Sequence, residues 1–233
     1  MSESIRDTEP GTERAAALAV LEAEALKHRL ANFGAFHPRP EDGVALACRT
    51  LVLLGPHEPG FWPHVTAQPE FSDRRPDPLD RWSRRVIGAL ARAFGAEPLF
   101  PFSGPPYHPF QRWALRSGRA WLSPVGLLVH ERAGLMLSYR GALALPERIE
   151  LPHTPLEPPC SACAARPCLS ACPVGALEAE GYDVPACHGF LDTQAGAECM
   201  ERGCAVRRAC PVSASYGRRE DQSGWHMRRF HRA

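Results

Sequence analysis

Eight of the nine cysteines in this 233-residue chain lie between positions 160 and 210. They form two runs, C-x2-C-x4-C-x3-C-P and C-x11-C-x4-C-x5-C-P, and each run ends in Cys-Pro. Thiols this dense are typical of a metal centre or a disulfide framework, so they constrain this region more than any hydrophobic pattern does. In chain order they are Cys160, Cys163, Cys168, Cys172, Cys187, Cys199, Cys204 and Cys210.

Repeated cysteine runs that end in Cys-Pro are typical of bacterial ferredoxins that hold two [4Fe–4S] clusters. In that pattern one run supplies three thiolates to a cluster, and the fourth thiolate comes from the other run. The pattern therefore predicts two metal sites that exchange one ligand each. Cluster 1 is predicted to bind Cys160, Cys163, Cys168 and Cys210, and cluster 2 is predicted to bind Cys172, Cys187, Cys199 and Cys204.

Two other readings of the cysteines stay open. Zinc also takes four thiolates at short spacing, although such sites usually show two C-x2-C pairs and only one occurs here. Disulfides would require an oxidising compartment. The chain opens with Met1-Ser2-Glu3-Ser4, which is not an apolar signal core, so we expect a reducing, cytoplasmic setting. We expect Cys48, far from the runs, to be a small buried hydrophobe.

The composition excludes some partners. Hydrophobic residues make up 44% of the chain and charged residues 23%, an ordinary profile for a folded domain. The net charge of +1 does not favour nucleic acid or an anionic membrane as a partner. No apolar run approaches the roughly 20 residues that a membrane-spanning helix needs.

The residues before the cysteines predict an α/β domain, because segments with helical periodicity alternate with short apolar runs. The run 44–54 is almost continuously apolar, so we expect a strand in a sheet covered on both faces. Residues 56–78 are rich in proline and aromatic residues and predict a long ordered loop. The expected helices are 13–31, 77–94 and 109–116, and the other expected strands are 99–102, 126–130, 135–139 and 148–151, with 126–139 forming a hairpin.

The whole chain is predicted to have four parts. They are a flexible N-terminus (1–12), an α/β domain with a possible cofactor pocket (13–151), a small α+β ferredoxin-like domain with two clusters (152–216) and a basic tail (217–233). The tail is expected either to be solvated or to lie as a strap across the acidic residues of the cysteine unit.

The order of these features resembles that of the epoxyqueuosine reductase family and, more loosely, of the reductive dehalogenases. The segments that carry the resemblance are Ala120-Trp121, 126–130 and Gly134, followed by a proline-rich linker and the two cysteine runs. The resemblance implies that the clusters pass electrons to a cobalamin bound by the first domain. The candidate cofactor contacts are Trp62 and His64, from the aromatic loop 56–78, and His130.

Two differences from that family change what the resemblance implies. The stretch 102–110 contains no Asp or Glu where the family has its proton donor, so Tyr107 and His108 are the only candidate catalytic residues there. The helical-repeat tail that binds tRNA in the family is also missing, so we do not expect tRNA modification.

Three functions follow as hypotheses. The first is electron transfer by two [4Fe–4S] clusters, within the protein or to another one, with a flavodoxin or ferredoxin reductase system as the electron donor. The second is a cobalamin-dependent reductase acting on a small-molecule substrate. The third is a structural metal-binding module without redox activity.

Overall fold

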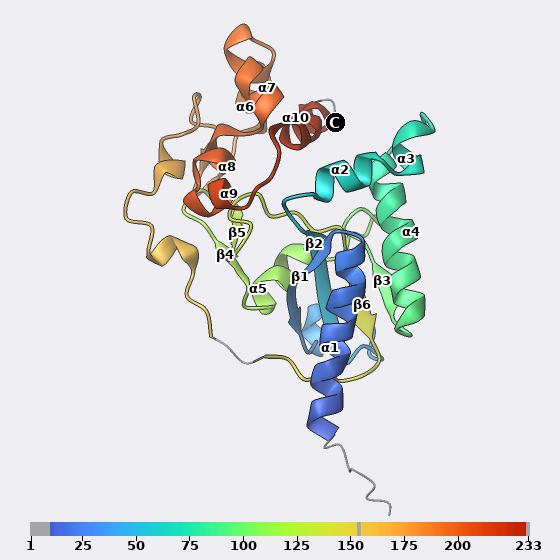
Figure 1. The fold of residues 1–233 in the computed structure, drawn as a ribbon. Helices are drawn as coiled ribbons and strands as arrows, with labels where there is room; N and C mark the ends of the chain where they lie inside the picture. The colour runs from blue at the N-terminus through green and yellow to red at the C-terminus, as the bar shows by residue number, and fades with distance from the viewer. Residues whose placement is uncertain (1–9, 153–154, 232–233) are drawn as a thin grey trace, which may run out of the picture.

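The computed structural model describes residues 10–152 and 155–231 and combines helices with small antiparallel sheets (Figure 1). Its largest sheet has four strands in the order β1-β2-β6-β3, and each strand is antiparallel to its neighbours. The predicted mixture of helix and sheet is therefore confirmed. The strands are β1 (Leu30–Phe36), β2 (Thr50–Pro56), β3 (Glu97–Leu99) and β6 (Gly141–Leu145).

The central strand β2 is buried along its whole length because helices cover both faces of the sheet. Val52 and Leu54 point into a core formed with helices α1 (Pro10–Lys27), α2 (Phe61–Thr66) and α4 (Pro78–Ala93). Leu51 and Leu53 point to the opposite face, where they pack with helix α5 (Phe110–Arg116). Successive side chains of a strand alternate between faces, so an uninterrupted apolar run suits a sheet covered on both sides.

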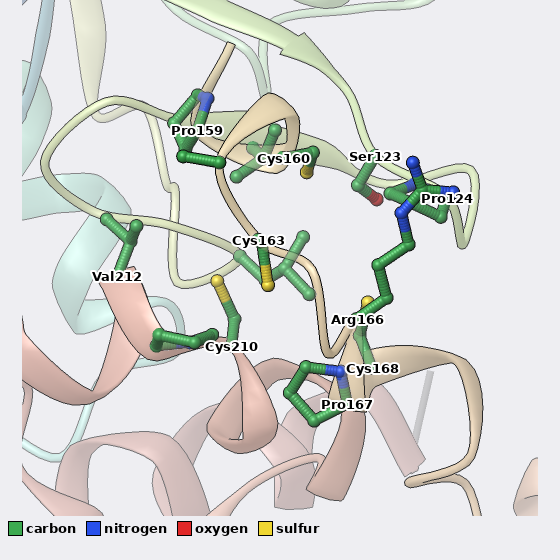
Figure 2. A pocket seen from close by; sticks show the side chains of 14 residues that line it. Ser123, Pro124, Pro159, Cys160, Cys163, Arg166, Pro167, Cys168, Cys210 and Val212 are labelled. Carbon is green, nitrogen blue, oxygen red and sulfur yellow. The ribbon is translucent and has the colours of Figure 1, made fainter.

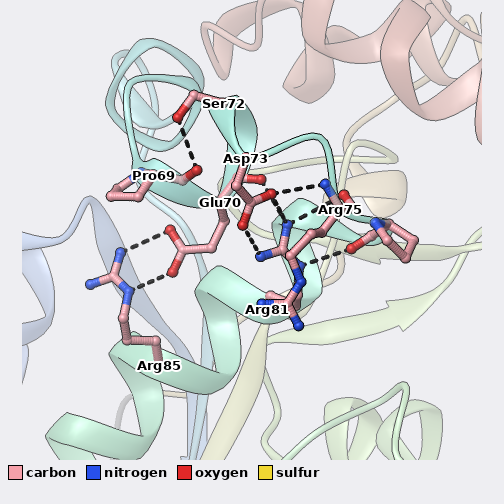
Figure 3. Close-up of polar contacts among 8 residues, drawn as sticks. Pro69, Glu70, Ser72, Asp73, Arg75, Arg81 and Arg85 are labelled. Carbon is pink, nitrogen blue, oxygen red and sulfur yellow. Dashed lines mark hydrogen bonds and ion pairs between the residues drawn. The ribbon is translucent and has the colours of Figure 1, made fainter.

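Residues 56–78 form two short helices instead of the long loop that we expected. Helix α3 (Pro69–Ser72) follows α2, and ion pairs hold α3 and the turn after it against α4 (Figure 3). Arg81 Nη1 lies 2.6 Å from Asp73 Oδ2, and Arg85 Nη2 donates to Glu70 Oε2 at 3.0 Å. These contacts fix a segment that local sequence alone leaves irregular.

Four other predicted elements were wrong in extent or kind, and one of them, the strand expected at 99–102, is observed as β3 at Glu97–Leu99. The first helix ends at Lys27 instead of residue 31, and β1 starts at Leu30 after Arg29, whose φ is 55°. It also starts earlier than expected, since residues 10–12 are helical, while residues 1–9 lie outside the described part of the chain. The strand predicted at 44–54 begins only at Thr50, and 148–151 is not a strand.

The predicted hairpin has a different partner. Strand β5 (Leu128–His130) pairs with β4 (Ala120–Leu122), not with residues 135–139, which are not a strand. Trp121 and Val129 of this β4–β5 hairpin pack with the cysteine unit, whereas His130 stacks on Phe33 of β1 in the large sheet, with 4.4 Å between the ring centroids. Residues 120–135 thus connect the two parts of the chain, although the sequence assigned them to the first domain alone.

The cysteine-rich part contains short helices and turns around a two-stranded ribbon (Figure 1). Its ribbon consists of β7 (Leu177–Glu178) and β8 (Gly181–Tyr182), and its helices are α6 (Val184–Leu191), α7 (Ala197–Arg202), α8 (Ala205–Ala209) and α9 (Pro211–Ser215). Further short 3-10 helices occur at Pro40–Asp42, Pro159–Ser161, Pro167–Leu169 and Gln194–Gly196.

The basic tail is a packed helix rather than a solvated segment. Helix α10 (Glu220–His231) lies along α7, and Gly224 sits so close to it that an added Cβ would be 2.2 Å from the Glu201 carbonyl oxygen. An ion pair of 2.6 Å joins Arg202 to Glu220. On its other side Trp225 contacts Trp62 of α2, with 5.3 Å between ring centroids. The tail therefore ties the cysteine unit to the first domain.

No helix among the described residues is long and apolar enough to cross a bilayer.

The contact between Gly134 and helix α9 gives a testable prediction for stability. Gly134 has a φ of +55°, and an added Cβ would lie 2.4 Å from the backbone nitrogen of Ser213. Gly134→Ala should lower the free energy of unfolding by about 1–3 kcal/mol in denaturant titrations, because strain and a backbone clash combine. Gly118→Ala is the matched control, since Gly118 also has positive φ but has no atom within 4 Å of the added Cβ. Equal losses in the two variants would show that this contact is unimportant.

Candidate metal centre

The first group of thiols surrounds one cavity between the two parts of the chain (Figure 2). The cavity has a volume of about 200 Å³. The β4–β5 hairpin and the residues after it contribute apolar walls, including Val129 and Leu135. Although the fourth cysteine comes from the second run, it faces the same space as three from the first. The four are Cys160, Cys163, Cys168 and Cys210.

The second group of thiols surrounds a separate, narrower cavity of about 20 Å³. Here one cysteine from the first run meets three from the second, among apolar side chains such as Leu177 and Val206. The four are Cys172, Cys187, Cys199 and Cys204. The structure thus places the eight cysteines in the two sets that the ferredoxin pattern predicts. A four-iron cube at the second set would require its thiols to spread apart.

The electrostatics of the thiols agree with this grouping. Burial raises the pKa of Cys160, and proximity to the other three thiols of the first set raises it further. Burial likewise raises the pKa of Cys187, with added contributions from the other three thiols of the second set. Thiolates are the form that binds metal, so occupation of either site must release protons.

Hydrogen-bond donors reach two sulfur atoms of the second set. The backbone N–H of Ala176 donates to Cys172 Sγ at 3.2 Å, and the hydroxyl of Tyr182 donates to Cys187 Sγ at 3.2 Å. Donors to ligand sulfurs stabilise their negative charge and tune the potential of an iron–sulfur cluster. Tyr182 was not among the residues that we predicted from sequence, because it follows a turn and carries no spacing signal.

The thiols are arranged around spaces instead of converging on a point. Among the described residues, no three His, Cys, Asp or Glu side chains lie close enough together to hold a single metal ion. A zinc ion requires its sulfur ligands about 2.3 Å from one centre. A cube of four irons carries its thiolates on separate corners and therefore farther apart. For the first set, the donor type, their number and the enclosed volume suit the cube better than a single ion.

The ninth cysteine has a different environment. Cys48 is buried in the core beside the sheet and its thiol donates to the Thr50 carbonyl oxygen at 3.3 Å. Burial raises its pKa to about 11. Cys48 is therefore a small buried hydrophobic residue of the core, as we expected.

The other candidate residues lie apart from the cysteines. Tyr107 is exposed, and His108 stacks on a tryptophan of α5. Trp62 is buried in an aromatic cluster with α10, and the His64 ring contacts a core tryptophan. His130 is fully buried, and its Nδ1 accepts backbone N–H groups of the following turn at 3.2 and 3.3 Å. None of the five lines the cavities around the cysteines.

Comparison of the chain with models of protein families, with curated proteins and with solved structures found no match.

Proposed function

We propose that this protein transfers electrons through two [4Fe–4S] clusters held by a ferredoxin-like unit at residues 152–216. The observation that supports it is the exchange of ligands between the runs. Cys210 faces the first set and Cys172 faces the second, as two-cluster ferredoxins require. When bound, the clusters supply one-electron redox chemistry. The protein's own part is to hold the eight thiolates, exclude water and stabilise charge on sulfur.

The position of the first site favours electron transfer within the chain as well as to a partner. Its walls include Val129 of the β4–β5 hairpin and Leu135 after it, so cluster 1, if bound there, would lie beside the segment that joins the two parts of the chain. The second site is enclosed by α6, α7 and the ribbon, on the side of α10. A flavodoxin or ferredoxin reductase system remains the proposed electron donor.

No observation favours the cobalamin-dependent alternative. Trp62 and His130, two of its three candidate contacts, are buried by other side chains, and the third, His64, does not line the cavities around the cysteines. The electron-transfer proposal therefore does not depend on a corrinoid.

An anaerobic redox titration tests the proposal. We expect the visible absorbance of the purified protein to bleach on reduction, in two one-electron steps per chain. A protein that shows no reducible chromophore after anaerobic purification would contradict the proposal.

Tyr182→Phe gives a finer prediction for the same titration. The substitution removes the hydroxyl that donates to Cys187 Sγ while keeping the ring that stacks on Phe230. Charge on the sulfur is then less stabilised, so the potential of cluster 2 should fall by about 10–50 mV while that of cluster 1 stays constant. Tyr107→Phe is the matched control, because Tyr107 is exposed and does not line this cavity. A shift of both potentials, or of neither, would contradict the assigned role of Tyr182.

A further inference from the structure

A third cavity adjoins the second set of thiols and is larger than either cysteine cavity. Its volume is about 390 Å³. Cys204 and Tyr182 line both this cavity and the smaller one inside the second set. The segment 136–138 forms another wall, and α10 closes it with His226 and Phe230. The cavity therefore lies where the first domain, the cysteine unit and the C-terminal helix meet.

Two guanidinium groups line this cavity without a carboxylate partner. Arg207 Nη1 donates to the Leu135 carbonyl oxygen at 2.8 Å. Arg218 Nε donates to Ser223 Oγ at 3.1 Å, and its Nη1 donates to the Met136 carbonyl oxygen at 3.5 Å. These neutral acceptors orient both side chains but cancel neither charge, and neither guanidinium is in an ion pair with the described acidic residues. An arginine has five N–H donors, so both keep donors for a ligand.

Two arginines and no carboxylate line the cavity. Burial, with the charge of the nearby Arg207 as the next cause, lowers the pKa of Arg218 to about 10. Burial also lowers the pKa of His226 well below its ordinary value, with Arg218, Arg140 and Arg207 as the next causes. One carboxyl group, that of Glu58, raises the pKa of Arg218, but it does not line the cavity, and burial raises the pKa of Glu58 itself. An anion in the cavity would relieve this repulsion.

The rest of the lining determines what kind of anion fits. Leu127, Met136 and Met227 make much of the wall apolar, and the volume lies in the range that small organic ligands occupy. Paired guanidinium groups recognise carboxylates and phosphates through parallel hydrogen bonds. We propose that this cavity binds a small organic anion, with its carboxylate or phosphate on Arg207 and Arg218 and its apolar body against the methionines. The lining of the cavity is enough to bind such an anion without a cluster. Only the position of the anion beside a cluster rests on the proposed function.

Isothermal titration calorimetry of the anaerobically purified full chain tests this inference. The probes are phenyl phosphate and benzoate, with inorganic phosphate as a bare anion and benzyl alcohol as an uncharged analogue. We expect phenyl phosphate or benzoate to bind at least tenfold more tightly than benzyl alcohol and inorganic phosphate. Whichever of the two binds more tightly identifies the charged group. Arg207→Gln and Arg218→Gln should each weaken that binding at least tenfold, whereas Arg228→Gln, at an exposed position of α10, should not.

Several outcomes would overturn the inference. The first is that phenyl phosphate and benzoate bind no more tightly than benzyl alcohol. The second is that inorganic phosphate binds as tightly as phenyl phosphate. The third is that both glutamine variants keep full affinity. If Arg218→Gln fails to fold, as judged by circular dichroism, the question is decided by comparing the affinity of Arg207→Gln, which removes the charge, with that of Arg207→Lys, which keeps it. The iron content of the same samples is measured separately. Iron without anion binding refutes this inference alone, while anion binding without iron refutes the proposed function and leaves the cavity assignment intact.

Discussion

Cys172→Ala should remove the same cluster as Cys187→Ala, although Cys172 stands in the first cysteine run. Each variant should lose about half of the bound iron, because each removes a ligand of the same one of two cubes. The reason is geometric, since both side chains line the second cavity. Cys160→Ala and Cys210→Ala should each remove the other cluster, because both cysteines line the first cavity.

Electron paramagnetic resonance of the dithionite-reduced variants distinguishes the two clusters. The Cys172 and Cys187 variants should keep one and the same signal, and the Cys160 and Cys210 variants should keep the other. Cys48→Ser is the control, and it should retain all iron because its thiol lies in the core beside the sheet. If the Cys172 variant instead matched the Cys160 variant, each run would hold its own cluster and the predicted grouping would be wrong.

Removal of the clusters should unfold the cysteine unit while the large sheet stays folded. The core of that unit consists of cysteines and only a few apolar side chains, among them Leu177 and Val206. Its helices are short, and such helices are not stable by themselves. The sheet, by contrast, has two apolar cores of its own. Metal sites of this kind contribute directly to the free energy of folding.

Hydrogen–deuterium exchange before and after chelation under oxidising conditions measures this difference. Amides in 160–216 should lose nearly all protection, and amides of β2 should keep theirs. Amides of α10 should lose protection too, because α7 is the surface on which that helix packs. Unchanged protection across 160–216 would mean that the thiols do not hold a structural metal group.

The sequence predicted best where one physical constraint dominates. The helix expected at 77–94 is observed as Pro78–Ala93, because proline fits the first helical turn and one face is apolar throughout. The two cavities divide the eight cysteines as the Cys-Pro pattern does, and the binding of a cluster by each set stays a prediction.

The sequence predicted poorly where tertiary contacts choose between alternatives. Leu30 continues the helical spacing of α1, yet it begins β1 because Arg29 leaves the helical region. The apolar segment 135–139 looks like a strand, but its first residue, Leu135, packs into the cysteine unit, and the backbone N–H of Leu135 donates to Ser213 Oγ. The proposed anion-binding cavity had no local signal either, because Arg207 of α8 and Arg218 line it together with residues 136–138, which are far away in the sequence.

The most direct test of the electron-transfer proposal is a measurement of iron, acid-labile sulfide and zinc in protein purified without oxygen. Two [4Fe–4S] clusters predict about eight iron atoms and about eight sulfides per chain. A preparation with stoichiometric zinc, little iron and no acid-labile sulfide would contradict the proposal.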